Sequence, residues 1–371
     1  MRAAAAGGGK YPPAQILIPC ACRRQNGGAP LPRRRIPGHD AGPACRICPI
    51  EPNSSGSAQK ARRRSSLGGL GEEDLQGIQQ FLCQEISSAA LTYRQMQRCA
   101  RSGEYAAFLS GSDQVWNGSW FLRDDVFFLK FAPREKRIAW APSFGTGQVA
   151  AYNRRRFARD IGAYRYLSAR EASGVQIIRQ LTGREAVQIT DPVLQLPAQR
   201  WRELYRHRQP AAYTGPYIFC YFLNEPNGEA LRCLDTWAAG GLTVLAFASR
   251  YACLESQPGI VFMGGSPWNF PALLDGAQAV LSDSFHALAF SLLFHKEVYI
   301  FHRSYLHASD QSERIVSLLD RMNLSDRFIQ AGSSAEPVCA PIAFDFVDEA
   351  LQQDRAAASA FLQEALEGCC K

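Results

Sequence analysis

Apolar residues recur along the chain with two periods, and both become regular only after about residue 71. Over residues 72–88 and 91–100 they recur at helical spacing. Near-continuous apolar runs such as Tyr217–Leu223, typical of buried parallel strands, alternate with further helical segments. This alternation continues on both sides of residue 210. We therefore predict an α/β fold with two Rossmann-like, doubly wound domains that face a cleft, over residues 71–210 and 211–371.

The pattern predicts ten strands and nine helices. The strands are expected at 105–109, 127–129, 137–145, 166–171, 187–194, 217–223, 242–248, 259–262, 279–281 and 298–301. The helices are expected at 72–88, 91–100, 152–161, 173–181, 228–239, 267–276, 285–294, 312–322 and 348–366. Asp191-Pro192 is expected to turn the chain away from helix at the end of its strand.

The stretch Ala279–Phe301 is the centre of this pattern, because it forms a complete strand, polar turn, helix and second strand. Asp283 or Ser284 is expected to cap the helix by accepting from its free N–H groups. His286 then lies in the first helical turn, where free N–H groups and the helix dipole attract anions. An ionisable imidazole beside an anion site suits transfer chemistry. A half-buried histidine that only packs at a helix start fits this position equally well.

Two further strand ends present polar groups. The first strand of the ordered part runs into Gly111, Ser112, Asp113 and Gln114, at the position where ligands bind in open α/β sheets. Gly111 permits a close backbone approach, but an ordinary Asx turn would explain the same residues. Arg170 also stands at a strand end, where its planar fork suits a carboxylate or phosphate; a pairing with a nearby glutamate is the alternative.

Residues 1–70 differ in composition from the rest. They contain 12 Lys and Arg but only two acids, a net charge of +10, together with 19 Gly and Pro. We expect this leader to be disordered, because it has too little apolar surface to offset the entropy of ordering. The pairs Cys20/Cys22 and Cys45/Cys48 suggest zinc or iron–sulfur binding only weakly. The triplets 33–35 and 62–64 suggest nucleic acid or acidic lipid, but a solvated tail without nucleic-acid binding is the favoured interpretation.

The composition of the whole chain excludes several classes of protein. A hydrophobic content of 46% and a charged content of 20% are typical of a globular protein. No apolar run is long enough for a membrane helix, and the N-terminus has no signal-peptide core. We therefore expect a cytoplasmic protein whose 12 cysteines are mostly free thiols.

Several motifs, in order, are similar to those of the polysaccharide pyruvyl transferases. The resemblance covers about residues 72–366 and is carried by 111–117, 143–145, 168–171, 190–194 with Trp201, 282–286, and 314–319 with 326–327. Each motif is weak alone, whereas six in family order make a strong match. The resemblance implies two Rossmann-like domains of the GT-B kind, as in nucleotide-sugar glycosyltransferases.

The implied reaction transfers a pyruvyl group from phosphoenolpyruvate to a glycan or lipid-linked sugar as a cyclic ketal, in exopolysaccharide or capsule assembly. No cofactor or metal is implied. We predict His286 as general acid and Arg170 as a catalytic cation on the donor, with Arg303 and Arg314 as weaker members of the same clamp. The remaining predicted substrate-binding residues lie in the two strand-end motifs: Gly111, Ser112, Asp113, Gln114, Asp283, Ser284 and Phe285.

Two departures from the family pattern are visible. Some members have an arginine where this chain has Ser284, so donor binding must depend on other cations. The family opens with a strand, a loop and a long helix, and we interpret residues 1–70, which lack these, as a wrongly started or frame-shifted leader. The alternatives are a nucleotide-sugar glycosyltransferase on the same architecture, and an inactive scaffold that binds glycan or associates peripherally with assembly enzymes.

Overall fold

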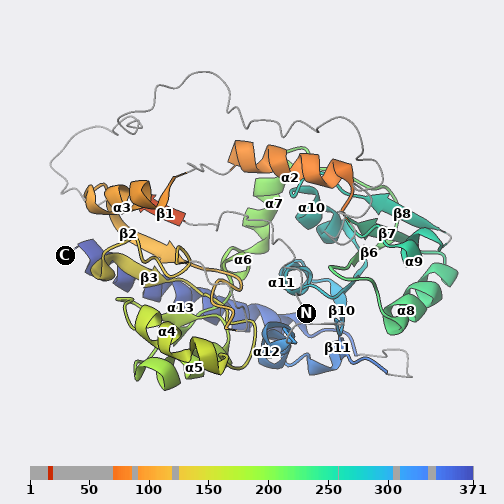
Figure 1. Cartoon of the computed structure of the whole chain (residues 1–371). Helices are drawn as coiled ribbons and strands as arrows, with labels where there is room; N and C mark the ends of the chain where they lie inside the picture. Colours follow the sequence, from red (N-terminus) through yellow and green to blue (C-terminus); the bar gives the residue numbers. More distant parts are fainter. Residues whose placement is uncertain are drawn as a thin grey trace, which may run out of the picture.

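The computed structural model describes residues 16–19, 70–85, 91–118, 125–257, 259–303, 310–332 and 340–370 (Figure 1). Its strands and helices form two α/β units, which confirms the predicted fold class. The cysteine pairs and arginine triplets of the leader lie outside the described residues. The described part of the leader is the strand β1, Ile16–Pro19, which pairs antiparallel with the first strand predicted after residue 71.

The second unit contains a six-stranded sheet in the order β11-β10-β9-β6-β7-β8, and every neighbouring pair is parallel. Its central strands are buried on both faces, as their continuous apolar sequence predicts. The strands are β6 (Tyr217–Tyr221), β7 (Thr243–Phe247), β8 (Ile260–Met263), β9 (Ala279–Ser282), β10 (Glu297–Phe301) and β11 (Phe328–Ile329). The helices are α8 (Gly228–Ala239), α9 (Ala252–Glu255), α10 (Asn269–Gly276), α11 (Phe285–Leu293) and α12 (Glu313–Arg321), with a 3₁₀ turn at Ser325–Arg327.

The first unit has smaller sheets. A three-stranded sheet has the order β1-β2-β3, and β4 pairs with β5 in parallel. A bridge between Ile138 and Tyr166 connects the two sheets. The strands after β1 are β2 (Tyr105–Ser110), β3 (Arg137–Ala139), β4 (Ser168–Ala169) and β5 (Val187–Gln188). The helices are α3 (Tyr93–Arg101), α4 (Ala151–Ile161) and α5 (Ala172–Thr182), with a 3₁₀ turn at Arg134–Lys136.

The strands expected over 137–145 and 166–171 are shorter in the structure, Arg137–Ala139 and Ser168–Ala169, and two further predictions from the strand pattern were wrong. Phe127, Phe128 and Leu129 form turns, because the apolar side chains enter a compact aromatic core in which Phe128 stacks on Trp116 with ring centroids 6.0 Å apart. The strand expected over 187–194 ends after Gln188. The helix α6 (Pro192–Gln195) follows, because Asp191 accepts from the Val193 N–H and proline fits the first helical position.

Elements from each end of the described chain pack across the predicted boundary at residue 210. The helix α2 (Glu72–Glu85) lies over α7 (Ala198–Arg206) and α10 (Figure 1), and its Asp74 accepts from the Gly265 N–H at 2.7 Å. The long helix α13 (Phe344–Cys370) begins in the core of the second unit. It ends against the first, where Phe361 and Trp140 stack. The domain limits themselves remain a prediction.

Candidate functional site

The turn between β9 and α11 is built differently from the predicted cap. Ser284 occupies the N-cap position with an extended backbone, but its side chain makes no capping hydrogen bond. Asp283 accepts instead from the N–H groups of Leu223 and Asn224, at 2.7 and 3.1 Å. The predicted side-chain cap was therefore wrong, because the Asp283 carboxylate holds the end of β6.

Arg303 forms an ion pair with the same carboxylate. Its Nε donates to Asp283 Oδ2 at 2.9 Å, and its Nη2 donates to the Asp283 carbonyl at 2.7 Å. Both side chains are almost fully buried. Asp283 and Arg303 thus form a pair that fixes the loop beside the start of α11, and the prediction that either contacts a substrate stays a prediction.

His286 lies in the first turn of α11, as the sequence predicts, and it is half-buried. Its ring meets that of Phe285 edge-on, with centroids 5.5 Å apart. The imidazole also lies near enough to two carboxylates of the first unit, Asp113 and Asp191, to lower the pKa of both. His286 therefore lies near these carboxylates of the first unit.

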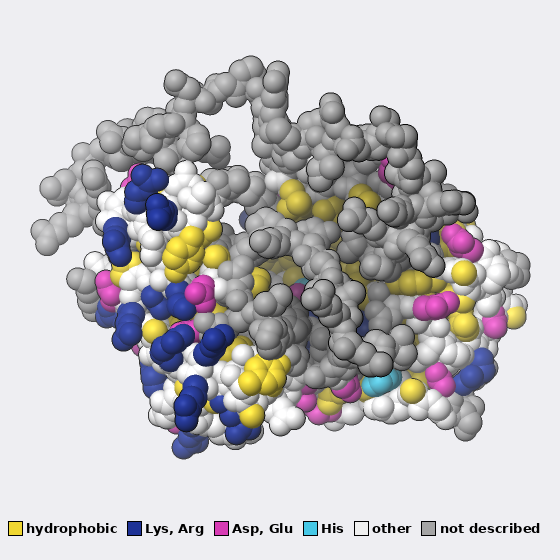
Figure 2. All heavy atoms as spheres, in the orientation of Figure 1, with side chains coloured by type: hydrophobic (Ala, Val, Ile, Leu, Met, Phe, Trp, Pro, Cys, Tyr) yellow, Lys and Arg dark blue, Asp and Glu magenta, His cyan; other side chains and the backbone are white. Residues whose placement is uncertain are grey.

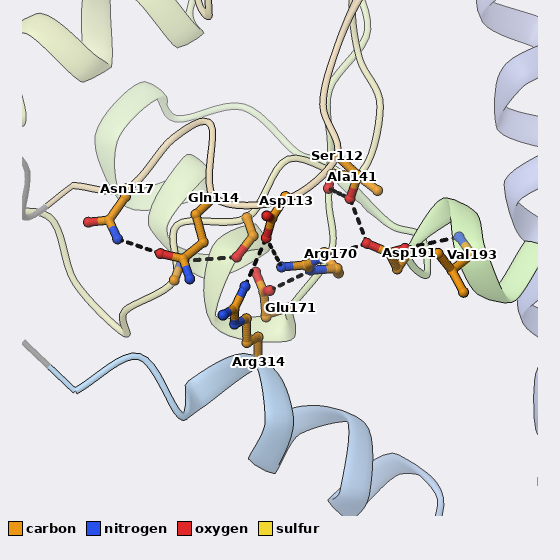
Figure 3. Close-up of polar contacts among 12 residues, drawn as sticks. Ser112, Asp113, Gln114, Asn117, Ala141, Arg170, Glu171, Asp191, Val193 and Arg314 are labelled. Atoms are coloured by element: carbon orange, nitrogen blue, oxygen red, sulfur yellow. Dashed lines mark hydrogen bonds and ion pairs between the residues drawn. The ribbon is translucent and has the colours of Figure 1, made fainter. Parts of the chain in front are cut away.

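Arg170 is the centre of a buried ion cluster just after β4 (Figure 3). Its side chain is 4% exposed. Nε donates to Glu171 at 3.0 Å, Nη1 to Asp191 at 2.6 Å, and Nη2 lies 3.5 Å from Asp113. Burial alone would lower the pKa of the guanidinium, but the three carboxylates together raise it.

Arg314 reaches this cluster from the second unit. Its Nη1 donates to Asp113 Oδ1 at 2.8 Å, and the amide end of Gln114 lies 3.0 and 3.1 Å from its Nη1 and Nη2. The guanidinium groups of Arg170 and Arg314 lie 4.4 and 6.0 Å from the centre of the Phe285 ring. Both cations therefore contact the residue that begins α11.

Asp113 connects the two units while remaining open to solvent, with a side chain 56% exposed. Its backbone has a positive φ of 58°, which aspartate tolerates better than most residues. Desolvation would raise its pKa, but Arg170, His286 and Arg314 together hold the pKa of this carboxyl below its ordinary value. Asp113 is therefore ionised wherever the protein is folded near neutral pH.

The pairing of Arg170 with a nearby glutamate, the alternative given from the sequence, is present with Glu171, but it is buried rather than on the surface. Asp191 was not predicted as a member of the cluster. Asp191 is buried, and its pKa lies below the ordinary value: burial opposes this shift, whereas Arg170, His286 and the Val193 N–H produce it. Both residues lay in the motifs that resemble the family. Asp191 is 21 residues beyond its arginine, so nothing local in the sequence predicts the pair.

Gly111 and Ser112 support this arrangement from the end of β2. The Ser112 hydroxyl lies 2.8 Å from the Ala141 carbonyl and 2.9 Å from Asp191 Oδ2. Gly111 has a φ of +133°, and a β-carbon there would lie 1.9 Å from the Trp140 carbonyl oxygen. The close backbone approach predicted at Gly111 is therefore an approach to the chain's own backbone.

We expect Gly111→Ala to lower the free energy of unfolding by more than about 2 kcal/mol, because the new methyl group must displace backbone at a φ that favours glycine. Gly147→Ala is the matched control, since a β-carbon at that position would meet no heavy atom within 4 Å beyond its chain neighbours. Urea unfolding of both variants measures the difference. Equal stabilities would contradict the tight contact at Gly111.

The structure thus brings together His286, Arg170, Asp113, Gln114, Arg314 and Phe285, and it leaves Asp283 with Arg303 as a separate pair. Among the described residues no group of three or more His, Cys, Asp or Glu side chains is arranged to hold a metal. None of the described helices is long and apolar enough to cross a membrane. The described cysteines with defined side chains, such as Cys220 and Cys233, are not in disulfides.

Comparisons with known proteins identify a family. The sequence model described as polysaccharide pyruvyl transferase matches residues 38–305. The match begins within the segment interpreted as a leader, earlier than the motifs at Gly111, and it ends before the motif at Arg314. No curated protein sequence matches the chain.

Solved structures share the architecture at low similarity. The UDP-GlcNAc 2-epimerase of Neisseria meningitidis has a TM-score of 0.42 and 9% identity, over 78% of this chain and 82% of that one. The corresponding epimerase of Methanocaldococcus jannaschii has a TM-score of 0.38 and 11% identity, over 70% and 72%. A glycosyltransferase from Streptomyces nogalater has a TM-score of 0.33 and 14% identity, over 72% of each chain.

Proposed function

Because the chain belongs to the polysaccharide pyruvyl transferase family, we propose that it transfers the pyruvyl group of phosphoenolpyruvate to two hydroxyl groups of a sugar. The observation that best supports this is the position of His286, which lies in the first turn of α11 against Phe285, the residue whose ring Arg170 and Arg314 both approach. An imidazole beside free helical N–H groups and guanidinium groups suits a donor with both a carboxylate and a phosphate.

The reaction needs a proton at one carbon. His286 gives a proton to the methylene carbon of the enol ester, which makes the adjacent carbon electrophilic. One sugar hydroxyl adds to that carbon, the carbon–oxygen bond to phosphate breaks, and inorganic phosphate leaves. A second hydroxyl then closes the ketal ring. The two hydroxyl protons are released, one in each addition: one returns to His286 and the other leaves on hydrogen phosphate, so that atoms and charges balance.

The cations divide into two roles. Arg314 is the better candidate for contact with the donor, because its partner carboxylate Asp113 is half exposed and can exchange places with a ligand anion. Arg170 has two of its three nitrogens held by buried carboxylates. We therefore propose that Arg170 mainly positions Phe285 and Asp113, while Nη2 remains its one route to the donor.

The test is phosphate release from phosphoenolpyruvate by the full chain in the presence of a panel of glycan acceptors. We expect release that depends on an acceptor, with a product that carries the added pyruvyl ketal by mass spectrometry. UDP-sugars provide the comparison in calorimetry. Saturable binding of a UDP-sugar, together with no phosphate release from any acceptor, would overturn the proposal in favour of glycosyl transfer.

A further inference from the structure

Charge is distributed very unevenly between the two halves of the ordered chain. Residues 71–210 contain 20 basic and 14 acidic side chains, whereas residues 211–371 contain 9 basic and 18 acidic ones. On the face drawn in Figure 2, Lys and Arg side chains gather where Figure 1 places α4 and α5, and acidic side chains are more frequent on the opposite half. A field of this kind orients the protein toward an anionic surface.

The helix α4 exposes three consecutive arginines, of which Arg154 and Arg155 lie on the side of α5. Asn153 and Phe157 point into the unit, whereas Arg154, Arg155 and Arg156 are exposed in a row. No described carboxylate forms an ion pair with any of these three arginines. Their charge is therefore not neutralised within the described chain.

A groove of about 300 Å³ lies between α4 and α5 beside this row. Its floor is apolar and its rim is polar and cationic. The lining residues are Gln148, Val149, Arg154, Arg155, Ala158, Ile177, Gln180 and Leu181. An exposed tyrosine, Tyr152, with 59% of its surface accessible, lies in the first turn of α4 outside the lining of the groove. Arginine beside a shallow apolar floor, with an exposed tyrosine on the same helix, is typical of surfaces that contact a lipid interface.

We propose that this α4–α5 face docks the protein on a membrane surface rich in anionic phospholipid. Arg154, Arg155 and Arg156 bind the lipid phosphates, and the groove accepts the glycerol region of one lipid. A nucleic acid fits less well, because Tyr152 is the only large exposed aromatic described on α4 or α5 and offers no platform for stacked bases. The proposal goes beyond the transfer reaction, and its test does not require activity.

The experiment is flotation of the full chain with vesicles of phosphatidylcholine alone or with about a third phosphatidylglycerol, at about 0.1 M salt. We expect binding to the anionic vesicles only. Replacing Arg154, Arg155 and Arg156 together by Gln should weaken binding about a hundredfold, because each arginine near such a surface contributes about fivefold.

The matched control replaces Arg94, Arg98 and Arg101 of α3, which removes the same charge from another exposed helix of the same unit. We expect this variant to lose less than about fivefold. The basic leader is common to both variants, so it cannot produce a difference between them. Equal losses in the two variants, absence of binding to anionic vesicles, or binding to an oligonucleotide but not to vesicles would overturn the proposal. Circular dichroism verifies that both variants fold.

Discussion

His286→Asn is expected to lower kcat for phosphate release from phosphoenolpyruvate by about 10²–10⁴-fold, the usual contribution of a positioned general acid. The KM for phosphoenolpyruvate should change by less than about threefold, because asparagine keeps the start of α11 and its N–H groups in place. Steady-state phosphate release with a saturating acceptor measures both constants.

His295→Asn is the control for this prediction. His295 follows the other end of the same helix, is exposed, and contacts Asp348 at 3.0 Å. We expect its replacement to leave kcat unchanged. If the wild type is active and both histidine variants retain its full activity, His286 does not supply the proton.

Arg170→Gln is expected to lower the free energy of unfolding by about 3–5 kcal/mol, because it leaves Glu171 and Asp191 as buried carboxylates without their cation. Urea unfolding at neutral pH measures this loss. Arg179→Gln is the control, since Arg179 and its partner Glu185 are more than 70% exposed. An exposed pair of this kind contributes less than about 1 kcal/mol.

The loss caused by Arg170→Gln should shrink as the pH falls. In the wild type the pKa of Asp191 lies below its ordinary value of 3.8, so its stabilising contribution is present above about that pH and is lost as the pH falls further. In the variant, burial without the arginine raises the pKa of the Asp191 carboxyl. As the pH falls, this carboxyl is therefore protonated in the folded variant at a higher pH than in the folded wild type. A deficit that is the same at about pH 7 and about pH 4 would contradict this assignment of charge.

The central motif was predictable because its signals are local. The apolar run of β9, the polar turn and the apolar helix α11 each depend on residues within one or two turns of one another. His286 was therefore placed in its helical turn correctly. The prediction that Asp191-Pro192 turns the chain away from helix was wrong, because the Asp191 side chain caps a helix that begins at Pro192.

Most members of the ion cluster were predictable, but Asp191 and the pairs that connect distant parts of the chain were not. Gly111, Asp113, Arg170 and Arg314 were all identified as candidates, but the contact between Arg314 and Asp113 spans 201 residues of sequence. Their pairing depends on how the two units pack against each other, and the spacing of apolar residues along the chain does not predict that packing. The sequence pattern also suggested substrate roles for Arg303 and Asp283, and only the packing shows that they hold each other.

The sequence by itself determined the alternation of the main strands and helices, the family, and the presence of a histidine at the first turn of α11. The tertiary structure decided which charges neutralise one another, which cation keeps an exposed partner, and where unpaired arginines collect. The physical reason is the distance along the sequence over which each effect acts. Backbone preferences depend on neighbours along the chain, whereas the energy of a charge depends on burial and on groups that only folding brings near.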